Sequence, residues 1–190
     1  MARPAPFPIH QRIEQLSPGG RYCLNALVSA ASVLLCLLVL HLRLPGMELA
    51  GIGPNWLLIW VVAWSLKRPM VESAAAGVVL GFLQDGLTMA EPTHALGLAL
   101  VGLLTSRLQK QRFLQEDFIS VALIVFGMAV VAETVMAVQF SFSGERSLAE
   151  IWTYHQQVAL SSAILSSLWA PVMYFPLNRW WQWMDNLNQP

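Results

Sequence analysis

The sequence predicts an all-α, polytopic integral membrane protein in which six transmembrane helices form one bundle. Of its 190 residues, 56% are hydrophobic and only 12% are charged, whereas about 25% of the residues of a soluble domain are charged. The charged residues lie mostly between apolar runs that approach the length needed to cross a hydrocarbon core of about 30 Å. The formal net charge is zero and no basic block is present, so we expect no nucleic-acid partner.

The chain divides into three predicted parts. Residues 1–22 contain several prolines and no helical period, which indicates a cytoplasmic tail. Residues 23–177 would form the six-helix bundle, and residues 178–190 a tryptophan-rich cytoplasmic C-terminus. Cys23 and Cys36 are expected to be buried free thiols, because no second pair of metal ligands lies nearby.

The first two spans are predicted at residues 25–42 and 54–66. The first apolar run is about twenty residues long, which is longer than the 7–15 residues of a signal peptide, so we interpret it as a retained span. Pro54 opens the second span, since proline suits the first turn of a helix. Trp56, Trp60 and Trp64 recur at intervals of four in it, which favours an aromatic stripe that faces lipid or the membrane interface.

The remaining spans are predicted at residues 70–87, 94–105, 117–140 and 151–175. The third and fourth are close to the lower length limit for crossing a membrane. The sixth is expected to be interrupted late by Pro171 and Pro176. Trp180, Trp181 and Trp183 follow and would form an aromatic anchor just past its end.

The distribution of lysine and arginine predicts the orientation. With six spans, nine of these residues fall on the side of the termini and two, Arg43 and Arg146, on the other side. Cytoplasmic loops carry the excess of positive charge, so both termini are expected to be cytoplasmic.

Small residues line one face of the third predicted span. Ser73, Gly77, Gly81 and Asp85 follow one another at intervals of four, which places them on one face of a helix. Such a small-residue seam lets another backbone come close. Asp85 has two interpretations: a cap that accepts N–H groups of the following turn, or part of a partner or ligand site near the outer surface.

A second small face and a buried acid lie further along the chain. Ser162, Ser166 and Ala170 share a face of the sixth span, so the third and sixth spans are expected to pack tightly on each other or on a span of a partner. Glu133 lies among apolar residues, where a charge costs about 2.5–3.5 kcal/mol. It is expected either to bond a serine or threonine of a neighbouring helix or to act in a gate, a ligand site or a partner contact.

Reactive groups do not converge in the sequence. No Ser/His/Asp set, phosphate-binding glycine loop or HExxH pattern is present. His94 is expected to be a helix-start residue rather than a metal ligand. We therefore predict no catalytic residues, no metal and no cofactor.

The order of these features resembles the rod shape-determining MreD family of bacterial membrane proteins. The likeness is carried by Pro54-Asn55-Trp56, the turn Lys67-Arg68-Pro69, the run from Gly77 to Gly86 with its Asp85, Leu96-Gly97, and Glu133 with the closing tryptophan-rich span. The chain departs from the family in its longer proline-containing tail and in residues 89–93, which lack a serine/glycine run.

This resemblance implies a non-enzymatic scaffold in the bacterial inner membrane that belongs to the cell-elongation complex and helps control cell shape and lateral peptidoglycan synthesis. The implied partners are the single-span protein MreC and, through it, MreB filaments and the wall synthases, besides membrane lipids. Asp85 and the face of Gly77 and Gly81 become candidates for shaping the contact with MreC.

A competing hypothesis comes from a further likeness of overall shape, to the substrate-binding membrane subunits of energy-coupling-factor vitamin transporters. In that case Asp85, His94, Glu133 and the tryptophans would line an outer pocket for a small vitamin.

Overall fold

A computed structural model shows helices and no strand in the part of the chain that it describes, which confirms the all-α part of the prediction. It describes residues 13, 16–42, 46–89, 91–110, 117–143 and 148–188. Most of the predicted tail, together with Arg43 and Arg146 of the charge count, lies outside these residues. The described helices are α2 (Pro18–His41), α3 (Trp56–Ser65), α4 (Met70–Thr88), α5 (His94–Lys110), α6 (Phe118–Ser143) and α7 (Leu148–Asn188).

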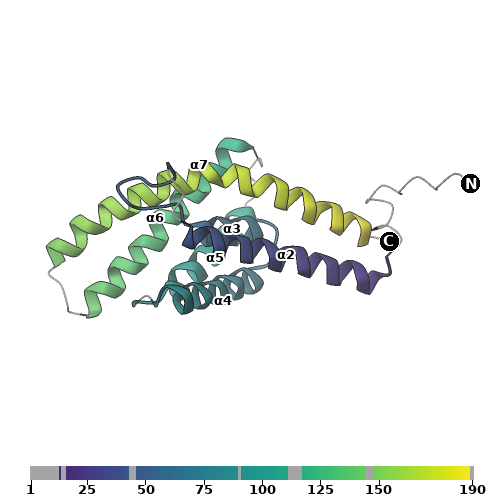
Figure 1. Cartoon of the computed structure of the whole chain (residues 1–190), viewed down its shortest axis with the longest axis horizontal. Coiled ribbons are helices and arrows are strands. Elements are labelled where there is room, and N and C mark those ends of the chain that lie inside the picture. The colour runs from purple at the N-terminus through teal and green to yellow at the C-terminus, as the bar shows by residue number, and fades with distance from the viewer. Residues whose placement is uncertain are drawn as a thin grey trace, which may run out of the picture.

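The longest helix, α7, runs along the whole length of the molecule (Figure 1). α6 packs along its first half and α2 along its last half, while α3, α4 and α5 lie between and beside them. The guanidinium group of Arg21, near the start of α2, donates a hydrogen bond to the carbonyl of Leu187, near the end of α7. The two ends of the helical chain therefore meet at one end of the molecule, as an even number of crossings requires.

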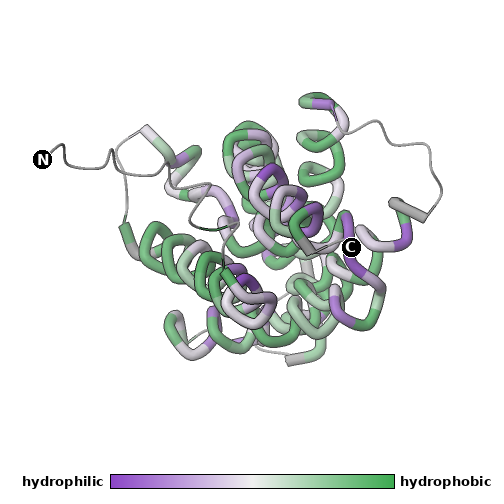
Figure 2. The backbone as a smooth tube through the Cα atoms, turned by 90° about the vertical axis from the view of Figure 1, so that its right-hand side faces the viewer, coloured by the Kyte–Doolittle hydropathy of each residue, from purple (hydrophilic) through white to green (hydrophobic). Residues whose placement is uncertain are grey.

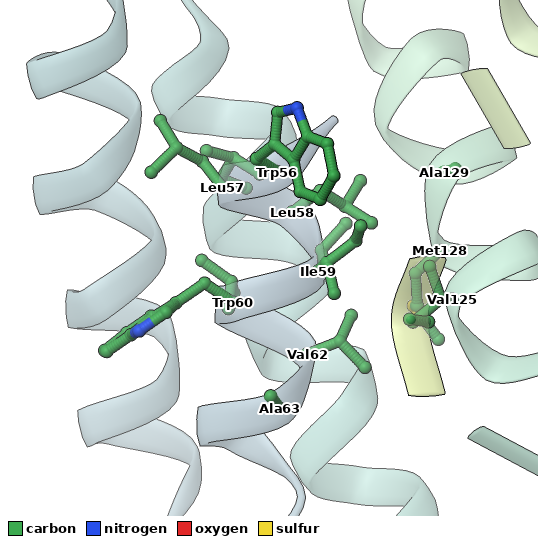
Figure 3. Packing of buried hydrophobic residues seen from close by; sticks show 14 of the residues in the cluster. Trp56, Leu57, Leu58, Ile59, Trp60, Val62, Ala63, Val125, Met128 and Ala129 are labelled. Atoms are coloured by element: carbon green, nitrogen blue, oxygen red, sulfur yellow. The ribbon is translucent and has the colours of Figure 1, made fainter. Parts of the chain in front are cut away.

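The shortest helix, α3, forms the centre of the core. Of its ten residues, all but Trp64 are buried, and the helix contacts α2, α4, α5, α6 and α7. Figure 3 shows its side chains reaching toward the surrounding helices, with Val125, Met128 and Ala129 of α6 on one side. A helix that is apolar on all sides is expected in such a central place, so the prediction of a lipid-facing tryptophan stripe is wrong.

Four helices, α2, α4, α6 and α7, are long and apolar enough to cross a membrane, whereas α3 and α5 are shorter. Apolar residues predominate along the helices (Figure 2). The chain is thus a multi-pass membrane protein. α3 rises by only about 15 Å, roughly half of the hydrocarbon thickness, so six full crossings remain a prediction.

The start of α2 and the end of α7 are the boundaries that differ most from the prediction. α2 begins at Pro18, because Ser17 accepts the N–H of Gly20 at 3.3 Å and proline occupies the first helical position. α7 continues through Pro171 and Pro176, so the predicted interruption is wrong. Each proline removes only one backbone donor, and the packing of α7 on α2, α3 and α6 holds the helix together.

Two side-chain predictions are corrected at this end of the molecule. Trp181 is 6% exposed within the core rather than part of an anchor past the last span. Both cysteines are free, but only Cys36 is buried. Cys23 is exposed because α2 packs mainly on α3 and α7 and leaves much of its surface open.

Candidate functional site

The small-residue seam of α4 lies directly on the backbone of α5. A β-carbon at Gly77 would lie 2.2 Å from the carbonyl oxygen of Leu98, and one at Gly81 would lie 2.3 Å from the Cα of Ala95. Real β-carbons essentially never come closer than 3.0 Å to such atoms. The close approach that the intervals of four predict is therefore present, and a helix of the same chain makes it.

α5 supplies glycines of its own to this contact. A β-carbon at Gly102 would lie 2.3 Å from the carbonyl oxygen of Ser73, whose side chain is fully buried. One at Gly97 would lie 3.3 Å from the carbonyl oxygen of Ala132 on α6. The role of Gly102 was missed from the sequence, although its spacing of five from Gly97 is a visible signal that α5 meets two helices on different faces.

The small face of α7 and the small face of α4 pack on different helices. The Ser166 hydroxyl accepts the backbone N–H of Asn55 at 2.9 Å, and the side chain of Asn55 in turn caps α3 through the N–H of Leu58 at 3.0 Å. Within the described chain the main neighbours of α4 are α5 and α3, whereas those of α7 are α6, α3 and α2. The expected contact between the third and sixth spans is therefore replaced by separate contacts with helices between them.

Asp85 caps the helix that follows its own. Its carboxylate accepts the backbone N–H of His94 at 2.9 and 3.1 Å and the hydroxyl of Thr93 at 2.5 Å. The Nδ1 atom of His94 lies 2.6 Å from the same carboxylate. The capping interpretation of Asp85 and the placement of His94 at a helix start are thus confirmed, and together they fix the turn between α4 and α5.

Glu133 joins the same polar group from α6. The hydroxyl of Ser162 on α7 donates a hydrogen bond to its carboxylate, and His94 interacts with it electrostatically. The amide nitrogen of Gln139 donates to the carbonyl oxygen of Thr93 at 3.1 Å, which is a second link between α6 and the start of α5. Asp85, His94, Glu133 and Ser162, which we call the four-helix polar cluster, therefore tie together α4, α5, α6 and α7.

A narrow groove between α6 and α7 opens beside this cluster. Its cavity volume is about 60 Å³, which is room for about four to six water-sized groups and far below the roughly 300–1,000 Å³ of typical small-molecule pockets. Its walls are mostly apolar, with Glu133 on one side and two polar side chains on the other. They consist of Glu133, Met136, Ala137 and Phe140 from α6 and Ile151, Tyr154, His155 and Val158 from α7.

Trp60, Trp64 and Trp181 lie elsewhere, in the packing of α3 against α2 and α7. The indole nitrogen of Trp60 donates to the Ser32 hydroxyl at 2.8 Å, and that of Trp181 donates to Ser29 at 3.1 Å. Trp60 and Trp64 both contact the edge of Trp181. The pocket that would combine these rings with Asp85, His94 and Glu133 is not formed by the described residues.

The described residues contain no group of three or more histidine, cysteine, aspartate or glutamate side chains that could hold a metal ion. The side chains around His94 join helices through hydrogen bonds and charge. They also give the groove between α6 and α7 a polar side.

The family model of the rod shape-determining protein MreD matches residues 22–182. Neither the curated proteins nor the solved structures gave a significant match.

Proposed function

Because this chain belongs to the MreD family of rod shape-determining proteins, we propose that it is a scaffold of the cell-elongation complex in the bacterial inner membrane. The family match, which spans nearly the whole helical part of the chain, is the observation that carries this proposal. The family is one of structural, shape-determining membrane proteins. In the proposed role the chain binds an MreC-like single-span protein and so helps couple MreB filaments to lateral peptidoglycan synthesis.

The proposed orientation has six crossings with both termini in the cytoplasm. The meeting of the start of α2 with the end of α7 supports an even number of crossings. The guanidinium group of Arg68, between α3 and α4, lies 4.6 Å from the centre of the Trp64 ring, and Trp64 contacts Trp181 near the end of α7. Several positive charges thus gather at one end of the molecule, as expected for its cytoplasmic side.

The proposed scaffold works through a fixed geometry of helices. The glycines of α4 and α5 hold those two helices in backbone contact, and the four-helix polar cluster connects them to α6 and α7. A partner helix would then meet a surface whose parts keep their relative positions. Since α5 fills the face of Gly77 and Gly81, those residues and Asp85 would influence partner binding by positioning α4 against α5.

The proposal is tested by co-purification of the full-length chain with its MreC-like protein from membranes in mild detergent. An unrelated single-span membrane protein with a similar extracytoplasmic size serves as the control. We expect the MreC-like protein to be retained and the control to be washed away. Equal recovery of both, or loss of both, would contradict the proposed partner.

A further inference from the structure

The groove between α6 and α7 lies beside the four-helix polar cluster and has the carboxyl group of Glu133 in its wall. The α6–α7 hairpin extends beyond α4 and α5 at one end of the molecule (Figure 1). Tyr154 in the wall of the groove is exposed, and so are Val138 and Trp152, which line a second cavity between the same two helices. The groove therefore lies on a surface of the hairpin that no other described helix covers.

Two acidic side chains beside the groove have the same imidazole as their neighbour. His94 is in direct contact with Asp85, at 2.6 Å. Glu133 accepts the hydroxyl of Ser162 and interacts with His94 only electrostatically. The carboxyl group in the wall of the groove is therefore not the one that holds the imidazole.

Three arginines of the described chain lie far from the carboxyl groups of Asp85 and Glu133. Arg68 precedes α4 and Arg107 lies near the end of α5, whereas Asp85 and His94 lie at the opposite ends of these helices. Arg179 is seventeen residues beyond Ser162 on α7, or about 25 Å along the helix. A carboxylate in a membrane is costly unless a cation or a proton accompanies it.

From this arrangement we propose that the α6–α7 groove receives one lysine or arginine side chain from the transmembrane helix of a partner, with the carboxylate of Glu133 as its acceptor. The apolar walls at Met136, Phe140 and Ile151 suit the methylene stem of such a side chain. The small volume of the groove fits the end of one side chain and excludes a bulky ligand. The inference rests on the proposed function, because the partner is the MreC-like single-span protein.

The test measures binding of the full-length chain to that partner in lipid nanodiscs. Glu133→Gln removes the charge while its amide oxygen can still accept the Ser162 hydroxyl, and we expect the Kd to rise at least about thirtyfold. Glu72→Gln, which changes an exposed carboxyl in the first turn of α4, is the matched control and should leave the Kd unchanged. Ser162→Ala removes the internal hydrogen bond, keeps the carboxylate, and should also retain binding.

Two further measurements locate the contact. A cysteine at Tyr154, an exposed residue that lines the groove, should cross-link to a cysteine next to the basic residue of the partner span, whereas a cysteine at Val71 on α4 should not. Glu133→Lys should abolish binding, and replacement of the partner's basic residue by glutamate should restore it.

The outcomes separate the inference from the proposed function. If the partner binds the Glu133→Gln variant as tightly as the unchanged chain, or cross-links only from Val71, the groove inference is overturned and the proposed function stands. If lipid alone occupies the groove while the partner is bound, the groove inference is likewise overturned and the proposed function stands. If the partner does not bind the unchanged chain at all, the groove inference and the proposed function are both overturned.

Discussion

The carbonyl oxygen of Leu98 on α5 lies 2.2 Å from the point that a β-carbon at Gly77 on α4 would occupy. The two helices are therefore held together through their backbones, and the seam depends on the absence of side chains on both of them. Inside a membrane, where lipid is as apolar as a leucine side chain, this close packing is a main source of attraction between helices.

Replacement of Gly77 by alanine is expected to separate α4 from α5. Overpacking of this kind costs about 1–3 kcal/mol, so the thermal midpoint of the purified protein in detergent should fall. Gly86→Ala is the matched control on the same helix, since nothing lies within 4 Å of its β-carbon, and it should be neutral or slightly stabilising because alanine favours helix by about 1 kcal/mol. Equal midpoints for the two variants would contradict the backbone contact.

Loss of the Asp85 carboxylate should loosen the start of α5. Asp85→Ala leaves the N–H of His94 and the hydroxyl of Thr93 without their acceptor, which should cost about 1–3 kcal/mol. Asp85→Asn keeps one acceptor oxygen and should cost less. The check is hydrogen exchange over the first turn of α5, which should become faster in the order wild type, asparagine, alanine. Unchanged protection in the alanine variant would show that the cap does not hold this turn.

The hydrogen bond from Trp60 to Ser32 should couple α3 to α2. Trp60→Phe and Ser32→Ala each remove one side of a 2.8 Å bond, and the double variant removes both. We expect the two effects on the free energy of unfolding to be non-additive by about 0.5–1.5 kcal/mol. Strictly additive effects in a double-mutant cycle would mean that the bond does not contribute to holding α2.

The orientation can be tested with single cysteines in a chain whose Cys23 and Cys36 are replaced by alanine. Met89, 91% exposed after α4, should be outside the cell, and Lys67, before α4, should be inside. A membrane-impermeant maleimide should therefore label Met89→Cys in intact cells and Lys67→Cys only after permeabilisation. The reverse pattern would contradict cytoplasmic termini, and labelling of both in intact cells would show that α4 does not cross.

The sequence was sufficient to predict which small and polar residues each helix presents. It was not sufficient to predict which helices pack against each other. The intervals of four from Ser73 to Asp85 predict a helix that another backbone approaches, and this is correct. Small faces on α4 and α7 are compatible with each other as well as with α5 and α3, so periodicity alone could not decide between these pairings. The glycines of α5 decide it, since Gly102 meets Ser73 and Gly97 meets Ala132.

The central place of α3 was hidden from the sequence for a physical reason. In a membrane protein, an outward face that contacts lipid and an inward face that contacts other helices are both apolar. Trp56, Trp60 and Trp64 therefore look the same in either environment. What marks Trp60 as internal is the serine that its indole nitrogen bonds, Ser32, which lies on another helix 28 residues away in the sequence.

The polar cluster was predicted as parts rather than as a whole. Asp85 was selected as the end of the small-residue seam, Glu133 as an acid among apolar residues and Ser162 as part of a small face. The structure brings Asp85 and Glu133 to His94, and Ser162 to Glu133. Their convergence depends on the α4–α5 turn and on the register of α6 against α7, and neither follows from local sequence.

The most direct test of the central claim, that this chain is a structural determinant of rod shape, is imaging of the cell outline after depletion of the protein in its own bacterium. We expect cells to become wider and round, and expression of the intact chain to restore the rods. Cells that keep a normal rod outline while the protein is fully depleted would contradict it.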